Sequence, residues 1–299
     1  MQDWFWLWIP ATLLAAAAQT ARNAMQRHLT ETLGTVGATH VRFLYGFPFA
    51  LVLFAGGCLA AGHMPPVPDA DTVVWIAAGA LSQVLATAAM LAAMRTQSFA
   101  LAVAYTKTEP VLVAVFAMIV LAEPVTSASA AAILLACSGV IAMSGNPWRK
   151  GGHDWRATAL GILSGGLFAL SAVFYRGGIL KLGEPLFWLA ALTALVLALG
   201  LQAATLTCYL AATDRPALRR VIAAWRPSLF AGAMGALASA GWFTAFSLAT
   251  AASVRTLALV EVLFSFAVGR RLFKQTVKPN ELAGLALVVA GVAILIVSA

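Results

Sequence analysis

Ten long apolar runs fill almost the whole chain, and they constrain its fold more than any other feature. Each run has about the 20 residues that an α-helix needs to cross the hydrocarbon core of a membrane. Strands of a membrane barrel would alternate over segments of about ten residues, and these runs do not alternate. The runs cover residues 4–24, 38–60, 72–94, 98–121, 127–145, 156–178, 186–210, 228–249, 252–273 and 280–298. The sequence therefore predicts an all-α polytopic membrane protein with ten transmembrane helices.

Composition excludes most soluble classes of protein. Apolar residues make up 62% of the chain and charged residues 10%, with a mean hydropathy of +0.89. A soluble domain averages roughly 45–50% apolar and about 25% charged residues. The three cysteines lie inside apolar runs and show no metal-ligand or pairing pattern. We expect the lipid bilayer as the surrounding medium, with no metal and no cofactor.

The net charge of +8 has an explanation that does not involve nucleic acid. Lys and Arg gather near alternate connections between the apolar runs, as in membrane proteins whose cytoplasmic loops are basic. Fifteen of them lie near the connections after runs 1, 3, 5, 7 and 9, against three near the others. This asymmetry predicts that both termini lie outside the cytoplasm.

An internal repeat divides the chain into two halves, residues 1–150 and 151–299. A shift of 152 residues places residues 79–97 on 231–249 and residues 107–142 on 259–294 without a gap. Glu109 then falls on Glu261, and Gly139-Val140 falls on Gly291-Val292. Because each half has five runs, an odd number, the second half must be inverted relative to the first. Inverted repeats are a recurring design of transporters, with the substrate near the bilayer midplane.

The motifs resemble those of the EamA-type branch of the drug/metabolite transporter superfamily. The resemblance is carried by Val41-Arg42-Phe43, by Lys107-Thr108-Glu109-Pro110-Val111 and by Leu121-Ala122-Glu123-Pro124-Val125. Ala122 stands where the family commonly has glycine, and the second-half counterpart of the loop glutamate is Gln275. Among its members the chain is most similar to bacterial aromatic amino acid exporters.

This resemblance implies two five-helix repeats around a central cavity and export of small metabolites, often amino acids. It also implies a multi-pass protein of the bacterial inner membrane. Because both halves are present in one chain, a monomer is expected. A carrier of drugs or other metabolites is the alternative, and a channel is another. Paired inverted halves favour alternating access over a channel.

Polar residues within the apolar runs are candidates for substrate binding, because a polar group in the bilayer core is costly unless it has a partner or a role. Several of them recur at helical spacing and would line one face of their helix. Interhelical hydrogen bonding is the alternative role for such residues. The candidates are Gln19, Asn23, Gln83, Thr87, Met90, Tyr105, Glu109, Ser171, Tyr175, Ser239, Trp242 and Glu261.

Glu109 and Glu261 allow two interpretations. Burial raises the pKa of a carboxyl group, so both could exchange protons during transport. Alternatively, either glutamate could neutralise Lys107, Arg42 or Arg255, and we favour this structural pairing. No metal-protease, nucleophile-elbow or phosphate-loop motif is present, so an enzyme is not expected.

Overall fold

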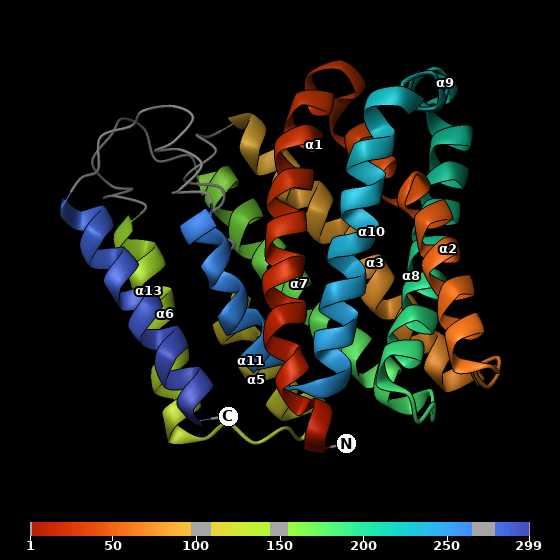
Figure 1. Ribbon diagram of the computed structural model, residues 1–299. Helices are drawn as coiled ribbons and strands as arrows, with labels where there is room; N and C mark the ends of the chain where they lie inside the picture. The colour runs from red at the N-terminus through yellow and green to blue at the C-terminus, as the bar shows by residue number, and fades with distance from the viewer. Residues whose placement is uncertain (1, 97–108, 144–154, 265–278, 299) are drawn as a thin grey trace. The chain divides into compact units, whose positions relative to one another are not determined.

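The computed structural model describes residues 2–96, 109–143, 155–264 and 279–298, and no strand occurs in these ranges. The helices before the midpoint of the chain are η1 (Gln2–Leu7), α1 (Trp8–Leu44), α2 (Gly46–Ala61), α3 (Ala70–Thr96), α5 (Glu109–Leu121) and α6 (Ser127–Met143). Those after it are α7 (Trp155–Lys181), α8 (Phe187–Thr213), α9 (Arg215–Ala223), α10 (Trp225–Leu248), α11 (Ala251–Leu257), η2 (Ala258–Val260) and α13 (Pro279–Ser298). Figure 1 shows these elements along the chain.

Five of the described helices are long and apolar enough to cross a membrane. They lie within 29–61, 70–93, 159–181, 187–213 and 225–248, and three shorter apolar helices lie within 109–121, 127–142 and 282–298. The helices α8 and α10 begin and end within three residues of the predicted runs, as do the start of α3 at Ala70, the start of α6 at Ser127 and the end of α7 at Lys181. The arrangement of ten spans as an inverted repeat remains a prediction.

The helices form two compact units, and each unit takes segments from both halves of the sequence. Unit 1 comprises Met1–Val84 and Phe174–Ala249, and unit 2 comprises Leu85–Val173 and Thr250–Ala299. The unit boundaries fall inside α3 and α7. In unit 1, α10 packs along α1, and α2 and α8 pack beside them. In unit 2, α13 packs along α6, and α11 packs on α5.

The connection expected between the first two runs is helical instead. Residues 25–33 are mostly good helix formers, so the helix continues past the predicted end at residue 24. The break comes at Gly34, whose φ of 71° and ψ of 178° lie in a region that only glycine adopts readily. Gln26 spans this break, because its Nε2 donates to the carbonyl oxygen of Ala38 over 2.8 Å.

We expect Gly34→Ala to destabilise the protein by about 1–3 kcal/mol, the usual cost of such backbone strain. A Cβ at this position would meet no atom within 4 Å, so crowding cannot contribute. Gly56 of α2 is the matched control, because its surroundings are equally open but it lies in a helix. Gly56→Ala should stabilise the protein by about 0.5–1 kcal/mol. Thermal unfolding in detergent measures both, and equal shifts would contradict the expectation.

Close packing between α6 and α13 is reciprocal. A Cβ on Gly139 of α6 would lie 2.5 Å from the carbonyl oxygen of Gly284 in α13. A Cβ on Gly291 of α13 would lie 2.7 Å from the carbonyl oxygen of Ala132 in α6. Gly291 and Gly284 follow Gly139 and Ala132 by 152 residues. The two helices therefore run antiparallel and exchange equivalent contacts.

Candidate functional site

A buried polar cluster of three side chains lies inside unit 1. Gln202 of α8 donates from Nε2 to Gln83 Oε1 of α3 over 2.8 Å and to the Tyr175 hydroxyl of α7 over 3.0 Å. The Tyr175 hydroxyl in turn donates to Gln83 Oε1 over 3.2 Å. All three side chains are buried, where polar groups need hydrogen-bond partners, and Gln202 Nε2 also donates to the carbonyl oxygen of Ala80 over 3.2 Å. We call Gln83, Tyr175 and Gln202 the polar cluster.

Aromatic and small residues hold the tyrosine of the polar cluster in place. The ring of Tyr175 lies 4.5 Å from the ring of Phe243, centroid to centroid. Gly79 of α3 also lies against the Tyr175 ring, since a Cβ at position 79 would lie 2.8 Å from Tyr175 Cδ1. A larger residue at position 79 would therefore displace the ring and its hydroxyl.

Gln19 and Asn23, two predicted site residues on α1, both accept hydrogen bonds within unit 1. Gln19 accepts a hydrogen bond from Trp242 Nε1 of α10 over 3.2 Å. Asn23 accepts one from Arg22 Nη2 over 2.7 Å. Gln19 and Asn23 are half-buried, whereas Trp242 and Ser239, both on α10, are buried. The structure thus joins Gln19 to Trp242 and Gln83 to Tyr175.

Two arginines bring positive charge into unit 1. Arg22 and Arg42, both on α1, are each 3% exposed. Both arginines lie beside Gly235 of α10, where a Cβ would be in ordinary van der Waals contact, 3.4 Å from Arg22 Cδ and from Arg42 Cγ. A buried charge must be compensated by charge or hydrogen bonds, so these arginines are strong determinants of the local electrostatics.

In unit 2 an ion pair joins the predicted Glu109 to Arg255. Arg255 Nε of α11 lies 3.1 Å from Glu109 Oε1 at the start of α5. The side chains are 7% and 16% exposed respectively. This is one of the pairings that the sequence left open for Glu109. Glu261, the repeat counterpart of Glu109, is also buried.

The other candidates in unit 2 lie on α3 and α7. Thr87 and Ser171 are fully buried, and Met90 is half-buried. The Ser171 hydroxyl has no hydrogen-bond partner within the described part of the chain. Tyr105, Lys107 and Gln275 lie outside the described residues.

The loop motif of the resemblance has a structural basis in unit 2. Ala122 has φ of 53°, in the left-handed region that glycine favours. The next residue, Glu123, accepts a hydrogen bond from the backbone N–H of Ala251 over 3.3 Å. The motif therefore ties the end of α5 to the first residue of α11.

Gln202 is the functional candidate that sequence reasoning missed. It is the amide side chain of an apolar run whose other polar residues are threonines and a tyrosine, and this could have marked it. Its repeat counterpart under the 152-residue shift is Ala50, so the symmetry gave no pointer to it. Within the described ranges, no group of three or more His, Cys, Asp or Glu side chains could hold a metal ion.

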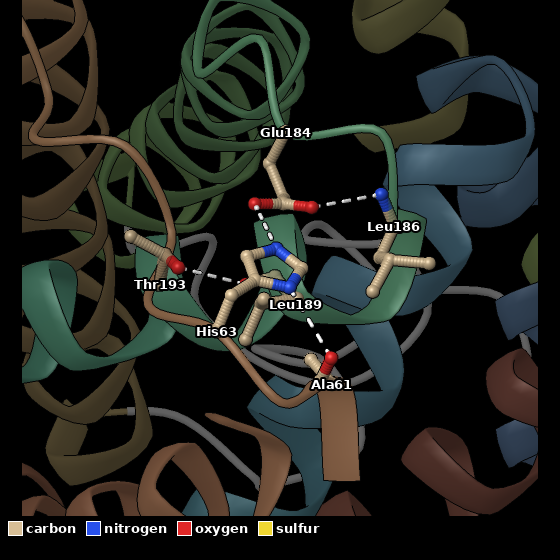
Figure 2. Close-up of polar contacts among 6 residues, drawn as sticks. All are labelled: Ala61, His63, Glu184, Leu186, Leu189 and Thr193. Atoms are coloured by element: carbon tan, nitrogen blue, oxygen red, sulfur yellow. Dashed lines mark hydrogen bonds and ion pairs between the residues drawn. The ribbon is translucent and has the colours of Figure 1, made fainter. Parts of the chain in front are cut away.

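A separate polar contact in unit 1 joins the α2–α3 loop to the α7–α8 loop, beside the first turn of α8 (Figure 2). Glu184 accepts the Leu186 backbone N–H on Oε1 over 3.0 Å, and Oε2 lies 3.3 Å from His63 Nε2. His63 Nδ1 lies 3.3 Å from the carbonyl oxygen of Ala61. Both ring nitrogens thus face acceptors, and only the doubly protonated ring donates to both.

We expect Glu184→Ala to lower the free energy of unfolding by about 1–3 kcal/mol, because it leaves the Leu186 N–H without its acceptor. His63→Ala should cost less than about 1 kcal/mol, since the His63 side chain is 46% exposed and that of Glu184 only 1%. Glu184→Gln, which keeps the Oε1 acceptor, is the conservative control. Thermal unfolding of the three variants gives the order, and a larger loss in His63→Ala would contradict it.

Comparisons with known proteins point to one family. Residues 6–145 match the profile of the EamA-like transporter family. The match covers 140 of the 299 residues, so the first half of the chain is similar to this family of membrane transporters. The structure is also similar to a solved crystal structure at 15% sequence identity, with a TM-score of 0.67, covering 97% of this chain and 99% of that chain. That likeness concerns the fold alone. No curated protein matches the chain.

Proposed function

We propose that the protein is a transporter that exports a small metabolite across the bacterial inner membrane by alternating access. The proposal includes two inverted five-helix repeats, residues 1–150 and 151–299, working within one chain. Amino acids with apolar or aromatic side chains are the first substrates to test. Other metabolites and drugs form the alternative substrate class.

The observation that carries this proposal is the reciprocal packing of α6 and α13. Helices that correspond under the repeat run antiparallel there, as an inverted repeat requires. Inverted repeats that rock against each other are the usual basis of alternating access.

The proposed substrate contacts in unit 1 centre on the polar cluster. Amide and hydroxyl groups can donate to a carboxylate and accept from an ammonium group. Trp242 and Phe243 offer aromatic surface on the neighbouring helix, which suits an apolar side chain. Gln19, Asn23 and Ser239 complete the proposed set in this unit. From unit 2 we propose Thr87, Met90, Glu109, Ser171 and Glu261, and Tyr105 is proposed from the sequence.

Counterflow of labelled amino acids into liposomes tests the function. A carrier exchanges substrate across the membrane and saturates, whereas a channel shows no stimulation by substrate on the far side. A resistance screen with toxic amino-acid analogues would select the substrate for this assay. Absence of saturable counterflow for every substrate that confers resistance would contradict the proposal.

We expect Gln202→Leu to reduce the initial rate of counterflow at least tenfold, because it removes the donor shared by Gln83 and Tyr175. Thr193→Val is the matched control on the same helix, since the Thr193 hydroxyl donates only to Leu189 O one turn away. It should retain transport within about twofold. Rates are normalised to folded protein, and KM is measured with the maximal rate. A purely structural role predicts a lower melting temperature with an unchanged KM, and that result would remove the polar cluster from the substrate site.

A further inference from the structure

A pocket of about 410 Å³ opens at the end of unit 1 where α8 finishes. It lies between the glycine break of α1, the last turn of α8 and the short helix α9, and its size is within the range of ligand pockets. Its principal lining residues are Thr32, Gly34, Thr35, Tyr209, Thr213 and Arg220. We call this the α9 pocket.

Helix α9 is a fixed wall of this pocket rather than a loose connection. Its residues Ala217 and Val221 are buried, and Val221 packs in a hydrophobic cluster with Leu29 and Leu33 of α1. The hydroxyl of Tyr45 donates to the carbonyl oxygens of Val221 and Ile222 over 3.0 and 3.1 Å. The start of α9 is capped, because Asp214 Oδ1 accepts the Ala217 N–H over 2.9 Å.

The outer face of α9 is strongly basic. Residues 209–226 contain four arginines, all exposed, and one carboxylate, the capping Asp214. Arg215, Arg219 and Arg220 lie on α9, and Arg226 lies in the first turn of α10. Glu31 of α1 is a further exposed carboxylate, and it directly precedes the lining residue Thr32. Arginine excess at this end favours an anionic partner.

Apolar side chains adjoin the basic face, as at a membrane interface. Ile222 of α9 is 55% exposed. Trp225 and Phe230, both near the start of α10, are each 49% exposed. Tyr209, in the pocket wall, is 52% exposed. Short amphipathic helices with arginines on one face and large apolar residues at their edge lie in the headgroup region of a bilayer.

The lining also offers hydrogen bonds. The hydroxyl oxygen of Thr35 is buried, and no partner for it lies in the ranges that the structure describes. Asp214 is committed to the helix cap, so Arg220 is the charged group of the lining that is available to a ligand. A guanidinium and a hydroxyl around one cavity match the oxygens of a phosphate group.

We propose that the α9 pocket binds the headgroup of one anionic phospholipid, with Arg220 on its phosphate. Arg215 and Arg219, on the same helix as Arg220, attract the anionic surface, and the apolar residues at the edge of α9 meet the acyl chains. This inference goes beyond the proposed transport function and does not depend on it. Basic pockets at the cytoplasmic end of membrane helices are a recognised setting for anionic headgroups.

Native mass spectrometry of the full chain tests the proposal, with phosphatidylglycerol and phosphatidylcholine as the two probes. We expect one phosphatidylglycerol to remain bound, and its affinity to fall at least fivefold in Arg220→Gln, the scale expected for one arginine near a lipid surface. Thr35→Val should weaken it less. Arg226→Gln is the matched control, because Arg226 is equally exposed but does not line the pocket. It should keep the bound lipid within about twofold.

Three results would overturn the proposal. Equal binding of phosphatidylcholine, whose phosphate is offset by the choline ammonium, would show that the net negative charge of the headgroup does not determine binding. Equal losses in Arg220→Gln and Arg226→Gln would show a diffuse basic surface rather than a pocket. Displacement of the lipid by 10 mM inorganic phosphate, with the same stabilisation against heat, would assign the pocket to a free phosphate. Each variant's melting temperature in detergent confirms that it is folded, and none of these readouts uses transport.

Discussion

Replacing Arg255 with alanine should lower the free energy of unfolding by about 3 kcal/mol or more. The substitution removes the guanidinium that lies 3.1 Å from Glu109 Oε1, at a site where the Glu109 side chain is only 16% exposed. Removing one partner of a buried ion pair typically costs about 3–5 kcal/mol, far more than the pair itself contributes. Thermal and denaturant unfolding of the purified protein would measure the loss.

The double variant Arg255→Leu with Glu109→Leu distinguishes the cost of leaving one charge unpaired from the cost of losing the arginine side chain itself. Replacing both partners by apolar groups of similar volume is often close to neutral, so it should recover most of the stability. Arg156→Ala, at an exposed arginine of the same unit, is the control and should change little. Additive losses in the double variant would show that Arg255 and Glu109 do not stabilise each other.

Replacing Gly139 with leucine should destabilise unit 2 by about 3 kcal/mol, the upper part of the range for overpacking. The new Cβ would lie 2.5 Å from a backbone oxygen of α13, which cannot turn away as a flexible side chain would. Because the packing is reciprocal, Gly291→Leu should have a similar effect through the backbone of α6. Gly56→Leu, at an open position, is the control.

Melting temperatures of these three leucine variants decide the matter. If Gly139→Leu and Gly291→Leu melt like the wild type, α6 and α13 are not in backbone contact. If only one of them is destabilised, the exchange symmetry of the contact is lost, and with it the main support for an inverted repeat.

Much of the candidate site could be identified from sequence, though not how its members pair. Gln83 and Tyr175 stand out as polar groups in apolar runs, and both belong to the polar cluster. Gln202 completes the cluster from a helix whose repeat counterpart offers no amide. Sequence also left three possible cations for Glu109, and the fold brings Arg255 within 3.1 Å of it. Pairings between distant segments depend on helix packing, which local pattern does not specify.

By itself, the sequence determined where several of the long helices lie and that they suit a membrane. Long apolar runs and turn residues act locally, so the bounds of helices such as α8 and α10 follow from them. Tertiary structure alone decided that α1 continues to a break at Gly34 and that α9 packs as a helix on the same unit. Those outcomes depend on contacts such as Val221 against Leu29 and Tyr45 against α9, between residues far apart in the chain. The free energy of such contacts depends on which surfaces meet, and only the folded arrangement fixes that.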